Sequence, residues 1–173
     1  MNSPSVVRVA GPSDYDSVWN LMLMSYAENA VFPLTEKKAR WCVERAIFPE
    51  RISPTDTGMR GVVGVIGPHG RPEGLAFIAI GSFWYSEVLH LEEYMVFVHP
   101  DYRKTNHVKA LLDWMELQVH ETGLPLMTGV FSESPRNAAK CRLYQRKFPK
   151  LGEFFYLKPK SGTMVNGLVA ASS

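Results

Sequence analysis

Cysteine is scarce in this chain, and its scarcity excludes two classes of protein. The 173 residues include only Cys42 and Cys141, which stand far apart in the sequence. They match neither the ligand spacing of a zinc site nor the disulfide framework of a small secreted domain. We therefore expect a cytoplasmic protein with both thiols buried as small hydrophobes. His99 and His107 match no metal motif either, and we assign no metal.

Long hydrophobic runs are also missing. No segment approaches the ~20 consecutive apolar residues that a membrane-spanning helix needs. Residues 1–16 lack the basic head and the long apolar core of a signal peptide. The sequence therefore predicts no membrane partner and no secretion, and it shows no internal repeat.

What the chain does contain is the composition of a globular domain. Hydrophobic residues make up 46%, charged residues 21% and aromatic residues 12%, too many aromatics for a disordered chain. At roughly 100–200 residues per domain, this length predicts a single domain. We place that domain at residues 1–160 and expect residues 161–173 to form a C-terminal tail that frays.

The small net charge of +2 hides an asymmetry along the chain. Residues 1–135 carry 11 Lys and Arg against 16 Asp and Glu, whereas residues 136–160 carry eight basic residues against Glu153 alone. Such a stretch suits an anionic cofactor or a nucleic acid, and it equally suits a solvated helix face. No nucleic-acid motif accompanies the charge, so nucleic acid is the less favoured partner.

Hydrophobic periodicity predicts four helices. The first begins at Ser13, an expected cap, and the second runs from Thr35 to the proline at position 49. A third helix carries an apolar stripe from Val108 to Val119 and ends at Gly123. The fourth opens at Ser134–Pro135 and extends to about residue 147.

Apolar runs between these helices predict the strands, and the order of elements predicts the architecture. The runs cover residues 5–10, 62–66, 75–80, 89–98, 126–131 and 154–157. An early antiparallel hairpin followed by a strand–helix–strand crossover implies a mixed sheet with helices on both faces. Strands 89–98 and 126–131 should be parallel neighbours in this α/β fold.

The segment from Val96 to Leu112 is the most informative part of the sequence. It is a strand, a proline turn, a basic loop and then a helix that Thr105 or Asn106 can cap. The first amides of that helix and its positive dipole end form a phosphate site in principle, supplemented by Arg103 and Lys104.

This segment resembles part of the GNAT family of acetyl-CoA-dependent N-acetyltransferases, and so does the later run Asn137–Tyr144. Family members carry Gln/Arg-x-x-Gly-x-Gly/Ala after the fourth strand, and Arg103 takes the first position here. Asn106 and Val108 stand where the family has glycines, which let the loop backbone approach a pyrophosphate. The resemblance spans roughly residues 6–157 and implies a mostly antiparallel sheet with one splayed parallel strand pair.

The resemblance implies acetyl-CoA as cosubstrate and an amine of a small molecule or a protein as acceptor. The cofactor-binding residues it implies are Val96, Val98, Arg103, Lys104, Thr105, Asn106, His107, Val108 and Asn137. It also implies that Tyr144 donates a proton to the leaving thiolate. The alternative for Tyr144 is a tyrosine packed at the helix–sheet seam.

The general base is sought on strand 89–98, where two glutamates are adjacent. Strict alternation puts Glu93 on the face of Met95 and Phe97, and Glu92 on the opposite face with Val96 and Val98. The spacing of the family's base favours Glu92, with Glu93 as the second choice. Both can also be solvated charges at the mouth of the splayed strands.

Two readings of the whole chain remain open from the sequence. The first is an N-acetyltransferase acting on a primary amine, and the second is a GNAT-like binding module with little turnover that binds a protein or nucleic acid. The aromatic cluster at residues 82–86 suits either an acceptor pocket with cation–π contacts or ordinary hairpin packing. The oligomeric state, including a homodimer, stays open.

Overall fold

The computed structural model describes residues 6–130 and 137–152. The elements in chain order are β1 (Arg8–Val9), α1 (Tyr15–Asn29), α2 (Glu36–Ile47), β2 (Arg60–Ile66), β3 (Gly74–Ser82), β4 (Leu89–Val98), α3 (His107–Thr122), β5 (Leu126–Met127) and α4 (Asn137–Gln145). Short 3₁₀ turns at Pro12–Asp14, Pro49–Arg51 and Pro100–Tyr102 connect some of them. Within these residues, none of the helices has the length and apolar character needed to cross a membrane.

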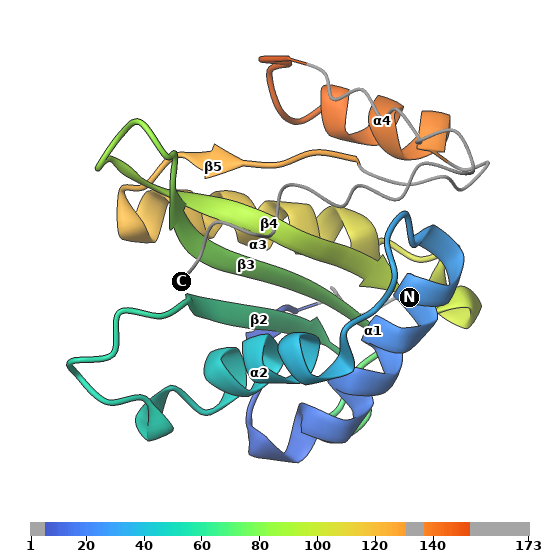
Figure 1. The fold of residues 1–173 in the computed structure, drawn as a ribbon. Helices are drawn as coiled ribbons and strands as arrows, with labels where there is room; N and C mark the ends of the chain where they lie inside the picture. Colours follow the sequence, from blue (N-terminus) through green and yellow to red (C-terminus); the bar gives the residue numbers. More distant parts are fainter. Residues whose placement is uncertain (1–5, 131–136, 153–173) are drawn as a thin grey trace, which may run out of the picture.

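The strands form one five-stranded sheet in the order β1-β2-β3-β4-β5. Neighbouring strands are antiparallel except β4 and β5, which run parallel (Figure 1). Helices α1 and α2 cover one face of the sheet and α3 covers the other. This arrangement confirms the predicted mixed sheet with helices on both faces.

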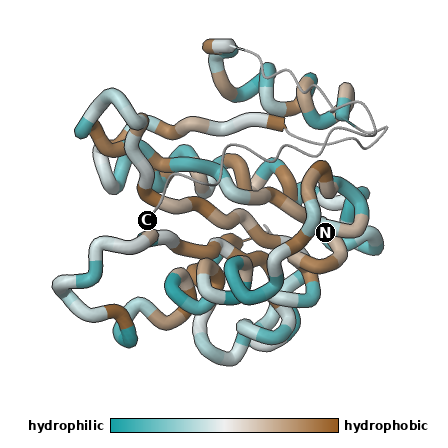
Figure 2. The backbone as a smooth tube through the Cα atoms, in the orientation of Figure 1, coloured by the Kyte–Doolittle hydropathy of each residue, from teal (hydrophilic) through white to brown (hydrophobic). Residues whose placement is uncertain are grey.

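The core lies in two layers, one on each side of the sheet. On the first side, Val18 and Val43 of α1 and α2 pack against Val63 and Phe77. On the second side, residues of α3 such as Leu111 pack against β3 and β4. Apolar residues accordingly concentrate along the central strands (Figure 2).

The parallel pair separates soon after it forms. Leu91 pairs with Leu126 and Glu92 with Met127, and no further pairing between β4 and β5 occurs within the described residues. The strand predicted over 126–131 is therefore shorter, although its neighbour and its direction are as predicted. The start of the fourth helix at Ser134–Pro135, the strand predicted at 154–157 and the tail at 161–173 lie outside the described residues.

A β-bulge in β4 overturns the predicted alternation along this strand. Phe77 pairs with Met95 while the adjacent Ile78 pairs with Glu93, so Tyr94 is an extra residue in β4. A bulge of this kind shifts the side-chain alternation by one position. Upstream of it Leu91 packs with α3, and downstream Val96 and Val98 pack there too, whereas Met95 and Phe97 pack on the α1 and α2 side. The predicted face-sharing of Glu93 with Met95, and of Glu92 with Val96, is therefore wrong.

The predicted cap at Ser13 is also wrong, because Asp14 occupies the N-cap position of α1, and its side chain makes no capping hydrogen bond to that helix. The fully buried Asp14 carboxylate accepts the backbone N–H groups of Gly11 and Gly70 at 2.9 and 2.8 Å. It also accepts two bonds from the Arg8 guanidinium, at 2.6 and 2.9 Å. The Asp14 side chain therefore links β1, the first turn and the β2–β3 connection through hydrogen bonds.

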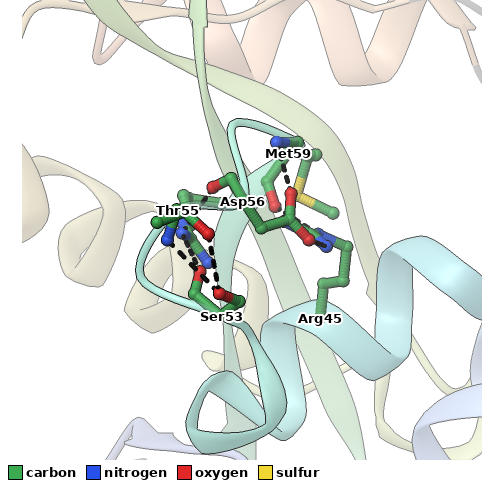
Figure 3. Close-up of polar contacts among 7 residues, drawn as sticks. Arg45, Ser53, Thr55, Asp56 and Met59 are labelled. Atoms are coloured by element: carbon green, nitrogen blue, oxygen red, sulfur yellow. Dashed lines mark hydrogen bonds and ion pairs between the residues drawn. The ribbon is translucent and has the colours of Figure 1, made fainter.

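Arg45 anchors the long connection between α2 and β2. Its guanidinium donates to both carboxylate oxygens of Asp56, at 2.7 and 3.0 Å, and its Nε donates to the Met59 carbonyl at 2.7 Å (Figure 3). The guanidinium also lies 4.7 Å from the Trp41 ring centroid. These contacts hold the connection against the C-terminal end of α2.

Candidate functional site

Two adjoining cavities open where β4 and β5 separate. The first, called the groove, has a volume of about 310 Å³, and the second, called the chamber, has about 240 Å³. Three residues line both of them: Val96 of β4, and Lys140 and Tyr144 of α4. The groove and the chamber are therefore two compartments that meet at one set of side chains.

The groove is lined by the second half of β4, the loop before α3 and the inner side of α4. Its described lining residues are Glu28, Val96, Phe97, Val98, Tyr102, Arg103, Thr105, Val108, Ala139, Lys140, Leu143 and Tyr144. Of the residues predicted to bind the cofactor, Val96, Val98, Arg103, Thr105 and Val108 are among them. The structure thus brings five residues from the predicted segment to one surface.

Arg103 is the fixed cation of the groove. Its Nε donates to the Val98 carbonyl at 3.2 Å, and its Nη2 donates to Glu28 Oε1 at 2.6 Å. The guanidinium has more N–H donors than these two hydrogen bonds use, so it can also bind an anion. Glu28, at the end of α1, competes with any such anion for Arg103.

Thr105 shapes the start of α3. Its hydroxyl accepts the backbone N–H of His107 at 3.2 Å, which identifies Thr105 rather than Asn106 as the residue whose side chain caps this helix. Val108 then presents a side chain to the groove at a position where the resemblance expects glycine. The groove is consequently narrower at the beginning of α3 than a glycine would leave it.

Four of the predicted cofactor-binding residues place their side chains elsewhere. Lys104 and Asn106 are exposed. The His107 ring is buried and bonded to Glu73 Oε2 at 2.7 Å, away from the groove. Asn137 accepts a bond from the Cys141 thiol at 3.5 Å and does not line either cavity. Their predicted role in cofactor binding remains a prediction.

The chamber is built by the end of α1, the middle of β4, the segment after β5 and α4. Its described lining residues are Ser25, Tyr26, Asn29, Ala30, Glu93, Tyr94, Met95, Val96, Gly129, Val130, Lys140 and Tyr144. Glu93 is the only carboxylate among them. Because of the bulge in β4, Glu93 shares its face of the strand with Val96, and its carboxylate bonds to Tyr144 of α4.

Glu93 is held by two hydroxyl groups. The Tyr144 hydroxyl donates to Glu93 Oε1 at 2.8 Å, and the Thr128 hydroxyl donates to Glu93 Oε2. Burial raises the pKa of Glu93 to about 7, although both hydrogen bonds and the charge of Lys140 oppose that rise. A carboxyl group that titrates near neutrality suits general base catalysis.

Tyr144 occupies the boundary between the two cavities. Burial and the neighbouring Glu93 carboxylate raise its pKa well above the usual value, so the phenol stays protonated at neutral pH. Its ring packs edge-on against Phe148 at 6.0 Å between centroids. The hydroxyl is thus a proton donor fixed beside a carboxylate.

Glu92, the first choice for a base from the sequence, lies outside both cavities. Its Oε1 is 3.0 Å from Nε2 of the buried His90, and its side chain remains 40% exposed. It covers Gly81 of β3, where a Cβ atom would come within 2.6 Å of its carboxylate. The geometry therefore brings Glu93, and not Glu92, together with Tyr144.

Lys140 is the cation of the chamber, and sequence reasoning missed it. Its Nζ donates to Asn29 Oδ1 at 2.7 Å, and the Asn29 amide nitrogen donates to the carbonyl of Ser25 at 2.9 Å. Lys140 lies one turn before Tyr144 on α4, so the i, i+4 spacing was an available signal. Sequence reasoning also missed Thr128. This residue lies beside Glu93 because of the pairing register of β4 and β5, which the local sequence does not predict.

The aromatic cluster in the β3–β4 connection is remote from both cavities. Phe83, Trp84 and Tyr85 are exposed by 40%, 95% and 68%, and none of them lines the groove or the chamber. Phe83 stacks on His90 at 4.6 Å between ring centroids. Of the two interpretations of this cluster, hairpin packing fits Phe83, whereas Trp84 and Tyr85 remain largely exposed.

Comparison with known proteins identifies the fold. No protein-family model and no curated protein matches the chain. Among solved structures, a ribosomal-protein-alanine N-acetyltransferase from Brucella melitensis biovar Abortus 2308 matches with a TM-score of 0.59 and 17% identity over 89% of this chain and 97% of the other. AAC(6')-Iy, in complex with the bisubstrate analogue CoA-S-monomethyl-acetylneamine, matches with a TM-score of 0.62 and 13% identity, covering 91% of this chain and 99% of the other.

A third structure carries the family name itself. A GNAT family acetyltransferase from Staphylococcus aureus subsp. aureus USA300_TCH1516 matches with a TM-score of 0.55 and 14% identity, covering 89% of this chain and 98% of the other. These three likenesses span almost the whole of each chain. The protein therefore has the GNAT acetyltransferase fold, as the sequence resemblance implied.

Proposed function

We propose that this protein is an acetyl-CoA-dependent N-acetyltransferase that moves an acetyl group to a primary amine by direct attack. The observation that carries this proposal is the Glu93–Tyr144 hydrogen bond of 2.8 Å, placed where the groove and the chamber meet in a GNAT fold. Acyl transfer from a donor in the groove to an acceptor in the chamber requires a base and an acid at the boundary between them.

The groove has the chemistry to hold acetyl-CoA. Arg103 provides a cation for a phosphate, and the helix start at Thr105–Val108 provides amides with a positive dipole end. Val96, Val98 and Leu143 provide an apolar wall for the pantetheine arm. A fold neighbour in complex with a CoA bisubstrate analogue supports this assignment.

Glu93 is the proposed general base. A lysine-like amine has a pKa of ~10.4, so it needs to lose a proton before it can attack. Glu93 lies in the wall of the chamber with a pKa raised to about 7, and it is ionised in a useful fraction at neutral pH. This proposal replaces Glu92, whose carboxylate is bonded to His90 outside the chamber.

Tyr144 is the proposed general acid. Its hydrogen bond to Glu93 provides the route by which Tyr144 regains a proton after the transfer. Acetyl-CoA supplies a thioester whose acyl carbon is attacked by the amine and whose thiolate leaves. Glu93 takes the proton that the amine nitrogen loses, and Tyr144 gives its phenolic proton to the sulfur. The proton on Glu93 then returns to the Tyr144 oxygen along their hydrogen bond. Both side chains regain their starting state, and the additional proton that an ammonium acceptor loses in becoming the attacking amine is released to solvent.

A screen of primary amines with acetyl-CoA, followed by release of the CoA thiol, tests the proposed activity. We expect thiol release that depends on an amine, with kcat/KM rising with pH as Glu93 ionises. Glu93→Gln should remove the part of that pH dependence centred near pH 7, while Glu92→Gln should leave it in place. The absence of thiol release with every amine would favour the binding-module alternative instead.

A further inference from the structure

The Thr128 hydroxyl bonds to the Glu93–Tyr144 pair, although Thr128 lines neither the groove nor the chamber. Strands β4 and β5 pair up to the residues just before Glu93 and Thr128, so these two residues lie side by side. The Thr128 hydroxyl donates to Glu93 Oε2, while the Tyr144 hydroxyl donates to Oε1 at 2.8 Å. Each oxygen of the carboxylate is therefore held by one hydroxyl, and only one of these hydroxyls belongs to a cavity wall.

Thr128 acts on both members of the pair. Burial raises the pKa of Glu93 to about 7, and the hydrogen bond from Thr128 is the largest influence that opposes this rise. Tyr144 and the charge of Lys140 oppose it as well. Burial and the Glu93 carboxylate also raise the pKa of Tyr144, and a hydrogen bond with Thr128 again opposes the rise. Thr128 therefore favours both the carboxylate of Glu93 and the phenolate of Tyr144.

The proposed reaction creates these two anions at different moments. Before the transfer, Glu93 carries the negative charge and the phenol of Tyr144 is protonated. Once Glu93 has taken the proton of the amine and Tyr144 has given its own to the sulfur, the charge lies on the phenolate. A threonine hydroxyl has one hydrogen to donate and rotates freely, so it can turn from one of these acceptors to the other.

We propose that Thr128 is a positioning residue whose hydroxyl donates to whichever of Glu93 and Tyr144 carries the negative charge. This inference rests on the proposed acetyltransferase function. Thr128 neither gains nor loses a proton: its O–H turns from Glu93 Oε2 to the Tyr144 oxygen, and it turns back when the proton returns to Tyr144. Each anion of the cycle thus keeps a hydrogen-bond donor in a site that burial makes unfavourable for charge.

Thr128→Val tests this role, because valine keeps the shape of the side chain and removes the hydroxyl. With acetyl-CoA and the amine that releases thiol fastest, the limb of the pH profile near pH 7 should move upward by about one pH unit or more. Glu93 is then harder to ionise, because Oε2 has lost its donor. That limb belongs to Glu93, because the other titratable groups in the described lining of the chamber are one lysine and three tyrosines: Lys140, Tyr26, Tyr94 and Tyr144.

The rate at high pH tests the second half of the proposal. Where Glu93 is fully ionised, the kcat of Thr128→Val should still be about tenfold below that of wild type, because the phenolate of Tyr144 has lost its donor. The affinity for CoA, measured by calorimetry, should be unchanged, because Thr128 does not line the groove. A kcat that recovers fully at high pH overturns the proposal, since Thr128 would then act on Glu93 alone.

Two further variants at position 128 separate the hydroxyl from packing. Thr128→Ser keeps the hydroxyl and should keep the pH profile and most of kcat, whereas Thr128→Ala should reproduce both effects of valine. Thr122→Val makes the same change at the exposed end of α3 and should leave both quantities unchanged. A melting curve of each variant shows whether the fold is retained. Equal losses in the serine and valine variants, or a wild-type profile in Thr128→Val, overturn the proposal.

A measurement without turnover distinguishes this inference from the function on which it rests. Titration of the glutamate carboxyl carbons by NMR follows Glu93 directly, and Glu93→Gln identifies its signal. The titration midpoint should be higher in Thr128→Val than in wild type, and equal midpoints overturn the inference even in an active enzyme. If no amine releases CoA thiol, the proposed function fails, while the titration still decides whether Thr128 favours the ionised form of Glu93.

Discussion

Tyr144 and Glu93 share one hydrogen bond of 2.8 Å across the boundary between the groove and the chamber. Each comes from a different element, α4 and β4, and a separation of 51 residues divides them in the sequence. If they exchange a proton in each turnover, they should behave as one unit in kinetics.

A double-mutant cycle tests that coupling. We expect Tyr144→Phe to lower kcat by about 10²-fold, because the leaving thiolate loses its proton donor, with little change in CoA affinity. Glu93→Gln should cost a similar factor, since the amine loses its base. The double variant should be no slower than the slower single variant, as measured by steady-state rates at saturating acetyl-CoA.

Independent roles predict a different result for the same cycle. In that case the two losses multiply, and the double variant falls by about 10⁴-fold. A Tyr144→Phe protein with the wild-type kcat would instead make Tyr144 a packing residue. A melting curve of each variant shows whether the fold is retained.

The sequence predicted the sheet and the helices on both faces, because these follow from local periodicity. It also singled out one contiguous segment, five residues of which line the groove, while their role in cofactor binding stays a prediction. It did not predict which glutamate enters the chamber. Alternation along a strand has a period of two, and a single extra residue at Tyr94 reverses every assignment across it. The residue types at positions 89–98 do not predict that bulge.

Long-range partners were also beyond sequence reasoning. Thr128 meets Glu93 because β5 pairs with β4 at Leu126 and Met127, a register set by packing of the whole sheet. Lys140 meets Asn29 across 111 positions of sequence. In the same way, Arg103 was predicted to face a phosphate but its bond to Glu28 of α1 was not.

The stability of the protein should reveal the unusual environment of Glu93. The pKa of this carboxyl rises from 4.5 to about 7 on folding, so the folded state retains a proton that the unfolded state releases. Unfolding is therefore favoured increasingly as the pH rises from about 4.5 to about 7. We expect the Glu93→Gln variant to gain in melting temperature relative to wild type across this range, measured by thermal melts at several pH values.

Below pH 4.5 the difference between Glu93→Gln and wild type should level off, because Glu93 is then protonated in both states. Glu92→Gln is the matched control, since it has the same chemistry at the neighbouring position. A constant difference between Glu93→Gln and wild type from pH 4 to pH 8 would contradict the raised pKa.

Glu28 should limit the affinity of the groove for CoA. Its carboxylate holds Arg103 at 2.6 Å, and an incoming phosphate has to compete with it. We expect Glu28→Gln to tighten CoA binding several-fold and Arg103→Ala to weaken it by about tenfold or more, because a charge-assisted contact is gained or lost. Calorimetric titration with CoA measures both.

Arg146→Gln, at an exposed position after α4, controls for the general loss of positive charge. It should change CoA affinity little. Unchanged affinity in Arg103→Ala would remove this residue from the cofactor site and would place the phosphates elsewhere.

Arg45 should stabilise the α2–β2 connection without affecting catalysis. Arg45→Lys keeps the charge but cannot reproduce the paired bonds to Asp56 together with the bond to the Met59 carbonyl. We expect Arg45→Lys to lower the free energy of unfolding by ~1–3 kcal/mol. For a chain of this size, each kcal/mol lowers the melting temperature by roughly 2–4 °C. The kcat of the folded variant should equal that of wild type, because Arg45 lines neither cavity.

The pH dependence of that loss identifies the Arg45–Asp56 pair as its source. Arg45 lowers the pKa of Asp56 from 3.8 to about 2, so the pair stabilises the fold above pH 3.8 and loses its effect as the pH falls through about 2. The difference in melting temperature between wild type and Arg45→Lys should therefore shrink as the pH falls from 4 toward 2. Arg51→Lys, whose side chain is 70% exposed, should show little difference at any pH. A difference between Arg45→Lys and wild type that does not vary with pH would assign the loss to the Met59 carbonyl and to packing against Trp41, and not to Asp56.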